Sequence, residues 1–382
     1  MPGGWVIGIE GIGVHEYMEY MRSVLKGRDA AVESLLARRL AEARSSKPRV
    51  ERGLRSRGDV FRVKAYLLGQ DVRVRSPAGI QIPLRIASNP AILIEGGDAV
   101  LYVRVSTLGS HPIPDPGSRT FICVGRVRLG ELEGRLRLDA TPALYPITYV
   151  ERVEDPRVFV GARGTELYHV RAVMPLKPLA GADSFVITFA STLEGEALRP
   201  NRMEPVRFRS PDGGEGVIRD YRDTFPLSES VMVVRPWFED LGLGAPLTAP
   251  REGPVLDAAT ARAYPELMPT SVERKTGSNC AVRVSSNEYL LIFHGVDSVF
   301  GTYHTYAALL SGDGELLAVT PEPILSPRPH DYFGARPSTL FPCGAALLGD
   351  ELVVSAGKDD EVVLILSAPL SKVFERMEFL AP

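Results

Sequence analysis

The order of apolar and polar positions divides the chain into a short helical part and a long strand-rich part. From about residue 15 to residue 44, apolar side chains recur at intervals of three and four, which is typical of helices with one buried face. Gly27 interrupts this pattern, and Asp29 can cap the helix that follows it. We therefore expect two N-terminal helices that end before Pro48.

The rest of the chain alternates apolar and polar residues and is rich in Val, Ile, Tyr and Phe, with Pro and Gly at the expected turns. This pattern predicts an all-β fold. The apolar face of the helix pair has to be covered, either by the strands or by another subunit, so a homo-oligomer is one expected arrangement. We expect residues 1–50 to form an N-terminal helical arm and residues 51–382 to form one catalytic domain.

A loose internal repeat specifies the fold further. In each copy a polar or small residue, often with Pro, precedes a β run, a turn and a second β run. The copies begin at Ser88-Asn89-Pro90, Glu154-Asp155-Pro156, Asp223-Thr224-Phe225-Pro226, Ser278-Asn279-Cys280 and Phe341-Pro342-Cys343-Gly344. Their spacing of roughly 55 to 70 residues predicts a five-bladed β-propeller, in which polar residues remote in sequence converge on one axis.

Composition narrows the classes of function. The net charge of −3 argues against a nucleic-acid partner, because binding to phosphate backbones needs a cationic face. The three cysteines form neither a disulfide framework nor a metal-binding spacing, so we expect no metal and no cofactor. Neither a secretory signal nor an apolar run long enough for a membrane span is recognisable, which predicts a cytoplasmic protein without a membrane partner.

Asp155 is the candidate general acid. Cleavage of a glycosidic bond requires a proton for the bridging oxygen while a nucleophile attacks the anomeric carbon. The neighbouring carboxylate of Glu154 and burial in a cleft would both favour the protonated form that an acid needs. Asp before Pro is also a common turn dipeptide, so the same residues fit a turn without a catalytic role.

The candidate nucleophile follows from the charges at the other repeats. Arg202, Arg235 and His294 are cations suited to holding inorganic phosphate, an anion that attacks without a second carboxylate. A hydrolase would instead need a carboxylate such as Glu273 or Asp297 to activate water. Each cation alone also fits a surface Arg or a structural His.

Sugar binding needs groups that grip hydroxyls and an aromatic platform. Asn89, Arg104 and Asp360 are the candidates for the first role and Tyr303 for the second, with Tyr306 and Trp237 as further aromatic candidates. Most aromatic residues of a propeller belong to its core, so each of these is open to a structural role. A nucleophile elbow of the G-x-S-x-G type is not found, which argues against a serine hydrolase.

These motifs together resemble glycoside hydrolase family 130, the mannoside phosphorylases and related enzymes. The resemblance extends from about Asn89 to the C-terminus. It rests on Asn89-Pro90 with Arg104, Glu154-Asp155-Pro156-Arg157, Val234-Arg235-Pro236, Lys275-Thr276-Gly277, Phe293-His294-Gly295-Val296, Phe341-Pro342-Cys343-Gly344 and Gly357 to Val362. The resemblance implies a five-bladed propeller that acts on β-mannosides.

The resemblance also implies roles for the matching residues. Asp155 corresponds to the family's general acid, which acts directly or through a substrate hydroxyl. The phosphate-binding positions fall on Arg202, Arg235 and His294, and the sugar-gripping positions on Asn89, Arg104 and Asp360. The implied activity is inverting phosphorolysis of β-mannosides to α-mannose 1-phosphate, with a mannoside and inorganic phosphate as partners. An inverting β-mannosidase that uses water and a non-catalytic glycan-binding propeller are the alternatives.

Overall fold

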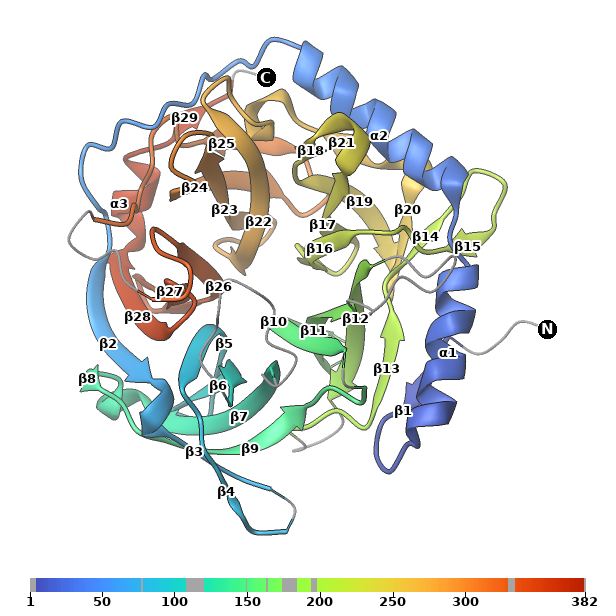
Figure 1. The fold of residues 1–382 in the computed structure, drawn as a ribbon. Coiled ribbons are helices and arrows are strands. Elements are labelled where there is room, and N and C mark those ends of the chain that lie inside the picture. Colours follow the sequence, from blue (N-terminus) through green and yellow to red (C-terminus); the bar gives the residue numbers. More distant parts are fainter. Residues whose placement is uncertain are drawn as a thin grey trace.

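The strands form five sheets around a central axis (Figure 1). The computed structural model describes residues 5–76, 78–107, 120–148, 150–162, 164–173, 184–193, 198–328 and 334–380. In these ranges the all-β, propeller-like arrangement that the sequence predicts is confirmed. Alternating apolar residues of neighbouring sheets interleave to form the core.

Each sheet extends outward from an innermost strand near the axis, with its strands in hydrogen-bonded order. One contains β5 (Ile86–Glu95), β6 (Asp98–Ser106), β7 (Thr120–Arg128), β9 (Leu138–Leu144), β3 (Val72–Arg75) and β4 (Gln81–Ile82). The next contains β10 (Glu151–Gly161), β11 (Gly164–Val173), β12 (Phe185–Leu193), β13 (Arg202–Pro205) and β1 (Ile7–Gly8). The third contains β16 (Tyr221–Pro226), β17 (Val231–Phe238), β19 (Leu247–Glu252), β20 (Val255–Asp257), β14 (Arg207–Arg209) and β15 (Glu215–Gly216), with β18 (Leu243–Gly244) paired to β17 and β21 (Arg262–Ala263) paired to β19.

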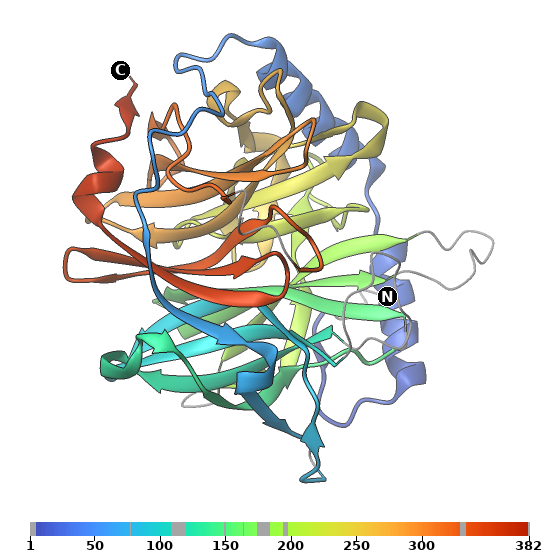
Figure 2. The same ribbon diagram turned by 60° about the vertical axis from the view of Figure 1, so that its left-hand side comes forward.

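The fourth sheet contains β22 (Glu273–Arg283), β23 (Glu288–Asp297), β24 (Tyr303–Ser311), β25 (Leu316–Val319) and β29 (Glu378–Phe379). The fifth contains β26 (Leu340–Leu348), β27 (Glu351–Lys358), β28 (Val362–Pro369), β2 (Arg62–Leu68) and β8 (Gly134–Arg135). Because β2 joins strands from the end of the chain, the N-terminal and C-terminal parts of the strand-rich region close the ring together (Figure 2).

The five repeats seen in the sequence are the five strands nearest the axis, namely β5, β10, β16, β22 and β26 (Figure 1). Each of these strands is irregular where its repeat begins. The register with the second strand shifts between Ser88 and Ala91, Glu154 and Arg157, Arg222 and Phe225, Ser278 and Cys280, and Pro342 and Gly344. A β-bulge therefore marks every inner strand at an equivalent position and re-aims the side chains there.

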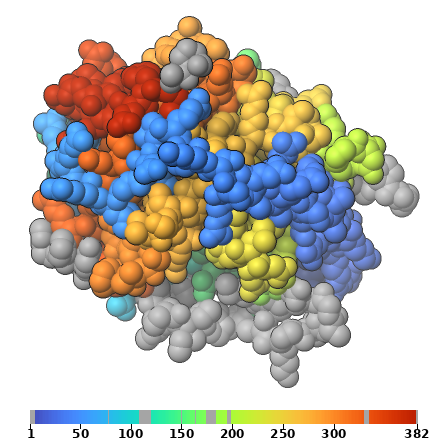
Figure 3. All heavy atoms as spheres, turned by 90° about the horizontal axis from the view of Figure 1, so that it is seen from above, coloured from blue at the N-terminus to red at the C-terminus, as the bar shows by residue number. Residues whose placement is uncertain are grey.

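The part of the chain that the structure describes contains three α-helices outside the ring: α1 (Val14–Lys26), α2 (Ala30–Ser45) and the short α3 (Leu370–Phe374). The expected break at Gly27 is confirmed, and the Asp29 carboxylate caps α2 by accepting hydrogen bonds from the backbone N–H groups of Ala31 and Val32. Figure 3 shows the N-terminal segment lying across the yellow and orange parts of the chain. In the described part of the chain, no helix has the length and apolar character needed to cross a membrane.

The apolar faces of α1 and α2 are covered by the sheets. Tyr17 and Met21 of α1 and Leu36 and Leu40 of α2 are buried in the same cluster as side chains of β10 to β21. The turn between the helices is also hydrogen-bonded to Val217, which fixes its path along the sheets. Of the two ways to cover the helices, packing on the strands is therefore the one observed.

This packing predicts unequal effects for two methionines of α1. Met21 is 6% exposed, whereas Met18 is 40% exposed. Met21→Ala should lower the free energy of unfolding by about 2–5 kcal/mol, because it removes buried methylenes and leaves a cavity. Met18→Ala, the matched control, should change it by less than about 0.5 kcal/mol. Denaturant unfolding of both variants measures this, and equal effects would contradict the docking of α1.

Candidate active site

The inner-strand bulges hold three polar residues in an unusual backbone conformation. Asn89, Asp155 and Asp223 have φ values of 47°, 50° and 52°, in the left-handed region. Asn and Asp occupy this region more readily than other residues with a Cβ, because their short polar side chains can bond locally. The repeat therefore carries Asn or Asp at these positions for a backbone reason, and the bulge turns each side chain away from the regular alternation of its strand.

Asp155 lies in a polar cluster with the three residues that the sequence assigns to sugar binding. Its Oδ1 accepts hydrogen bonds from Asn89 Nδ2 at 2.7 Å and from Arg104 Nη1 at 3.1 Å. Asp360 Oδ1 lies 3.4 Å from the same Asn89 nitrogen and 3.6 Å from Arg104 Nη2. The Asp155 side chain is 14% exposed, and its Oδ2 accepts no hydrogen bond from the described residues. One oxygen is thus fixed and the other is left for a substrate.

Arg104 sets the charge of this cluster. Burial opposes its positive charge, but Asp360, Glu154 and Asp155 together raise the pKa of the Arg104 guanidinium. The guanidinium therefore stays charged, and it lies in contact with both Asp155 and Asp360.

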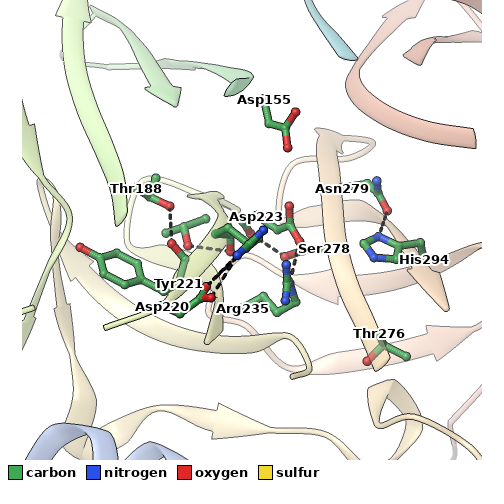
Figure 4. Close-up of polar contacts among 12 residues, drawn as sticks. Asp155, Thr188, Asp220, Tyr221, Asp223, Arg235, Thr276, Ser278, Asn279 and His294 are labelled. Carbon is green, nitrogen blue, oxygen red and sulfur yellow. Dashed lines mark hydrogen bonds and ion pairs between the residues drawn. The ribbon is translucent and has the colours of Figure 1, made fainter. Parts of the chain in front are cut away.

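The buried guanidinium of Arg157 connects Asp155 to a second polar cluster. Figure 4 shows Asp223, Arg235, Asn279 and His294 of this second cluster. Arg157 Nη1 donates to the backbone oxygen of Asp155 at 2.7 Å, and Nη2 donates to Asp223 Oδ1 at 3.3 Å. Its Nε donates to the backbone oxygen of Asn279. One side chain thereby fixes the relative positions of three inner strands, β10, β16 and β22.

Asp223 in turn holds Arg235. Arg235 Nε donates to Asp223 Oδ2 at 2.7 Å, and both side chains are at most 4% exposed. Although burial opposes ionisation, Arg235, Arg157 and Arg222 lower the pKa of Asp223. Asp223 is consequently a carboxylate that fixes cations and is not available as an acid.

His294 lies next to Arg235 and is held in one tautomer. Asn279 Nδ2 donates to the backbone oxygen of Pro342, so Asn279 Oδ1 is the atom that accepts from His294 Nδ1 at 2.9 Å. Burial and the cations Lys275, Arg235, Arg336 and Arg157 lower the pKa of His294. The neutral ring therefore carries its proton on Nδ1, and the buried Nε2, which has no hydrogen-bond partner among the described residues, can only accept.

Gly277 makes this arrangement possible. A Cβ at this position would lie 2.5 Å from His294 Cε1 and 3.0 Å from Arg235 Cδ. Any side chain would push the imidazole and the arginine apart. The Lys-x-Gly motif of the sequence thus has a packing explanation at its glycine.

Two further cations complete the second cluster, Lys275 and Arg336. Arg336 Nη2 donates to Tyr303 OH, and the Arg336 guanidinium and the Lys275 ammonium lie 4.9 and 5.6 Å from the centre of the Tyr303 ring. The Tyr303 ring also stacks on His294, with ring centres 5.0 Å apart. Among the described residues, neither Lys275 nor Arg336 forms an ion pair with a carboxylate. These two side chains are available to bind an anion.

The structure does not bring Arg202 to this site. Arg202 is exposed on β13, three strands out from β10, because the antiparallel ladder of its sheet carries β13 toward the rim. Arg222, directly before Asp223, occupies the inner strand instead and pairs with Asp220 at 3.0 Å. The repeat contained the signal, since Arg222-Asp223 stands where Glu154-Asp155 stands in the preceding copy.

Of the remaining candidate residues, one lies at the site and the others make structural contacts elsewhere. Tyr303 reaches the site, whereas Tyr306 is buried in the core and donates to the backbone oxygen of Gly53. Glu273 accepts two hydrogen bonds from buried Arg52 at 3.0 and 2.8 Å. Asp297 accepts from three backbone N–H groups of the following turn, which lower its pKa although burial opposes this.

A cavity of about 310 Å³ continues along the axis beyond Arg157. All five inner strands line it, mostly with apolar side chains and with the thiols of Cys280 and Cys343. Asp155, Asn89 and Arg235 do not border it, so the polar clusters and this cavity lie on opposite sides of the Arg157 guanidinium. A group of three or more His, Cys, Asp or Glu side chains that could hold a metal does not occur in the described ranges.

The Asp223 ion pairs predict a pH-dependent loss of stability. Because the pKa of Asp223 is lowered in the folded state, its contribution is present above the pKa of the unfolded chain, about 3.9, and is lost as the pH falls through the folded-state value. Asp223→Asn should lower the free energy of unfolding by about 3–5 kcal/mol at neutral pH, since Arg235 and Arg157 lose a buried partner.

Denaturant unfolding of the two proteins between pH 7 and pH 3 tests this. The difference should begin to shrink at the acid end, because there the unfolded wild-type chain binds a proton at Asp223 more readily than the folded protein does. Asp220→Asn is the matched control, because Asp220 is 20% exposed and should contribute less. A difference that stays constant with pH would contradict the assignment.

A model of one known protein family matches the part of the chain that contains most of the second polar cluster. The family described as beta-1,4-mannooligosaccharide phosphorylase matches residues 255–379, a stretch that includes Lys275, His294, Tyr303, Arg336 and Asp360. Asn89, Arg104, Asp155 and Arg235 lie outside this stretch and are joined to it only by the fold. A search of the curated proteins gave no match.

Solved structures share the fold. The β-1,2-mannobiose phosphorylase of Listeria innocua has a TM-score of 0.57 at 16% identity, over 85% of this chain and 94% of that one. A glycosyl hydrolase from Bacteroides ovatus has a TM-score of 0.53 at 12% identity, over 85% and 95%. A third structure comes from work showing that the same family of mannoside phosphorylases contains glycoside hydrolases that target β-1,2-mannosidic linkages in Candida mannan, with a TM-score of 0.51 at 13% identity over 75% and 85%. At these identities the likeness establishes the fold, and together with the family match it confirms the resemblance to glycoside hydrolase family 130.

Proposed function

We propose that the protein is an inverting β-mannoside phosphorylase. It transfers a mannosyl group from a β-mannoside to inorganic phosphate and releases α-mannose 1-phosphate and a shortened acceptor. The family match and the described polar clusters support this activity. The observation that carries the choice of phosphate is the pair of basic side chains, Lys275 and Arg336. They lack carboxylate partners among the described residues and lie over the Tyr303 ring, which stacks on His294.

In this proposal Asp155 supplies the proton. Oδ1 is occupied by Asn89 and Arg104, so the proton is carried on Oδ2 and passes to the bridging oxygen, directly or through a substrate hydroxyl. Asn89, Arg104 and Asp360 hold the mannosyl hydroxyls at the same time. The bond between the anomeric carbon and the bridging oxygen breaks, and the electron pair leaves with that oxygen.

The second cluster holds the nucleophile. A phosphate oxygen attacks the anomeric carbon from the face opposite the leaving oxygen and forms the new bond of the sugar phosphate. Lys275, Arg235 and Arg336 neutralise the phosphate charge. His294 Nε2, as an acceptor, is matched to the protonated oxygen of hydrogen phosphate. In this proposal His294 binds phosphate as a neutral ring, whereas the sequence predicts a cation at this position.

The rival hydrolase lacks a base at the expected places. Water would need a carboxylate across the sugar from Asp155, at about 6.5 to 9.5 Å. Both sequence candidates are engaged elsewhere, Glu273 by the buried guanidinium of Arg52 and Asp297 by the backbone of its own turn. Where a second carboxylate would be needed, the described residues supply cations.

We also propose that each of the five sheets serves as one blade of the ring. The proposed site then takes a bulged inner strand from every blade. Residues 51–382 contain all of the proposed site, whereas residues 1–50 cover the outside of the sheets.

The activity is tested with β-1,2- and β-1,4-mannobiose, with and without inorganic phosphate. We expect cleavage to require phosphate and Asp155→Asn to lower turnover by at least about 100-fold, because proton donation contributes about 10² to 10⁴. The variant should keep the unfolding midpoint of the wild type within a few degrees. Retained turnover in Asp155→Asn would remove the assignment of the acid, and equal cleavage without phosphate would establish a hydrolase.

Phosphate binding should be coupled to proton uptake. Burial, Arg235 and Arg336 lower the pKa of Lys275, while Asp223 opposes this and Arg222 adds to it. A bound anion raises that pKa again, so the protein takes up a proton on binding and the affinity for phosphate falls as the pH rises.

Calorimetric titration in two buffers of different ionisation enthalpy measures this uptake. Lys275→Met should abolish the uptake and weaken phosphate binding by about tenfold or more. The same uptake in Lys275→Met as in the wild type would show that another group is the proton acceptor.

A further inference from the structure

Arg336 stands apart from the motifs that carry the family resemblance. None of those motifs contains it, and it lies in the connection between β25 and β26, outside every repeat. Its guanidinium nevertheless lies on the face of the Tyr303 ring, in the second polar cluster. An exposed arginine on a loop usually has no fixed position, so its surroundings require an explanation.

The backbone around Arg336 is fixed from two sides. The Arg336 N–H donates to the backbone oxygen of Asp359, and the N–H of Tyr303 donates to the oxygen of Ser338. Thr339 N donates to the Asp359 carboxylate at 3.2 Å. The segment is thereby attached both to β24, which carries Tyr303, and to the turn that carries Asp360.

The position of Arg336 therefore lies between the two halves of the proposed site. Tyr303, to which it donates, is influenced by Asp360 from the sugar-binding side and by Arg235 from the phosphate side. Arg336 also lowers the pKa of Lys275 and of His294, which shows that its charge reaches both groups. Contacts of its backbone with Asp359 and of its side chain with Tyr303 therefore fix Arg336 between the sugar-binding and phosphate-binding parts of the proposed site.

The ion pairs of the second polar cluster leave two basic side chains without an anionic partner. Arg235 and Arg157 share Asp223, and Arg222 pairs with Asp220. Lys275 and Arg336 remain, two basic side chains that both lie over the Tyr303 ring and have no carboxylate partner among the described residues. Two positive charges side by side repel each other, and a bound phosphate dianion would remove this repulsion and favour the charged form of Lys275.

We propose that Arg336 is a phosphate-binding residue that takes the place the sequence assigned to Arg202. This inference rests on the proposed phosphorolysis. One guanidinium N–H already donates to Tyr303, which orients the planar group and leaves the other N–H groups to donate to phosphate oxygens. The tyrosine is thus a positioning residue for Arg336 as well as a candidate sugar platform.

The test measures phosphate binding by Arg336→Gln in the full-length protein. We expect the Kd for inorganic phosphate, by calorimetry, and the KM for phosphate to rise about ten- to a hundredfold, while kcat at saturating phosphate changes by less than about threefold. The Kd and KM of Arg336→Lys for phosphate should lie between those of the wild type and those of Arg336→Gln, because lysine keeps the charge but lacks the planar set of N–H donors. The melting temperature without phosphate should not change.

Arg274→Gln is the matched control. Arg274 is an exposed arginine directly before Lys275, and it is not among the cations that lower the pKa of Lys275 or His294. It should leave the Kd and both kinetic constants unchanged. An equal loss of affinity in the two variants would show a general field effect and overturn the assignment of Arg336.

The outcomes also separate this inference from the proposed function. If wild-type turnover does not require phosphate, the phosphorylase proposal fails, and the calorimetric Kd still decides the role of Arg336. If the wild type binds phosphate and Arg336→Gln binds it equally well, the inference fails while phosphorolysis stands. A wild type that binds no phosphate overturns both.

Discussion

The arrangement of the site depends on one buried guanidinium, that of Arg157. It is 3% exposed and donates to the backbone of Asp155, the backbone of Asn279 and the carboxylate of Asp223. A charge buried to this extent is tolerated only when it is fully paired, so these three partners cannot separate independently. These partners belong to three different sheets. Arg157 therefore fixes the distances between Asp155, Asp223 and Asn279 across the centre of the ring.

This constraint divides the proposed chemistry into two halves of opposite character. On one side Asp155 shares Asn89 and Arg104 with Asp360, and on the other Asp223 fixes Arg235 beside His294. The carboxylates that could serve water are bound to Arg52 or to a backbone turn, while Lys275 and Arg336 have no carboxylate partner in the described part of the chain. The proposal of phosphate as the nucleophile rests on this division of charge, since an anion is attracted where a hydrolytic base would need a carboxylate.

The propeller-like fold and many of the inner-strand residues of the site could be predicted from the sequence, because the same bulged-strand structure recurs in each repeat. Three of the five bulged inner strands carry Asn or Asp in the left-handed region, at Asn89, Asp155 and Asp223. Each of these residues stands at the start of a repeat that is recognisable in the sequence. Arg202 lies outside the inner strands, and the position directly before Asp223 in the third repeat is occupied by Arg222. Arg336 gave no signal, because a loop between repeats has no periodicity, and its position follows only from hydrogen bonds to Tyr303 and Asp359.

The central claim is that a phosphate oxygen, and not water, forms the new bond at the anomeric carbon. Cleavage of β-mannobiose in the presence of ¹⁸O-labelled phosphate, with the products followed by NMR and mass spectrometry, tests it most directly. Phosphorolysis predicts α-mannose 1-phosphate whose oxygen between carbon and phosphorus carries the label. Free mannose that has taken its anomeric oxygen from the solvent, with all label remaining in inorganic phosphate, would contradict it.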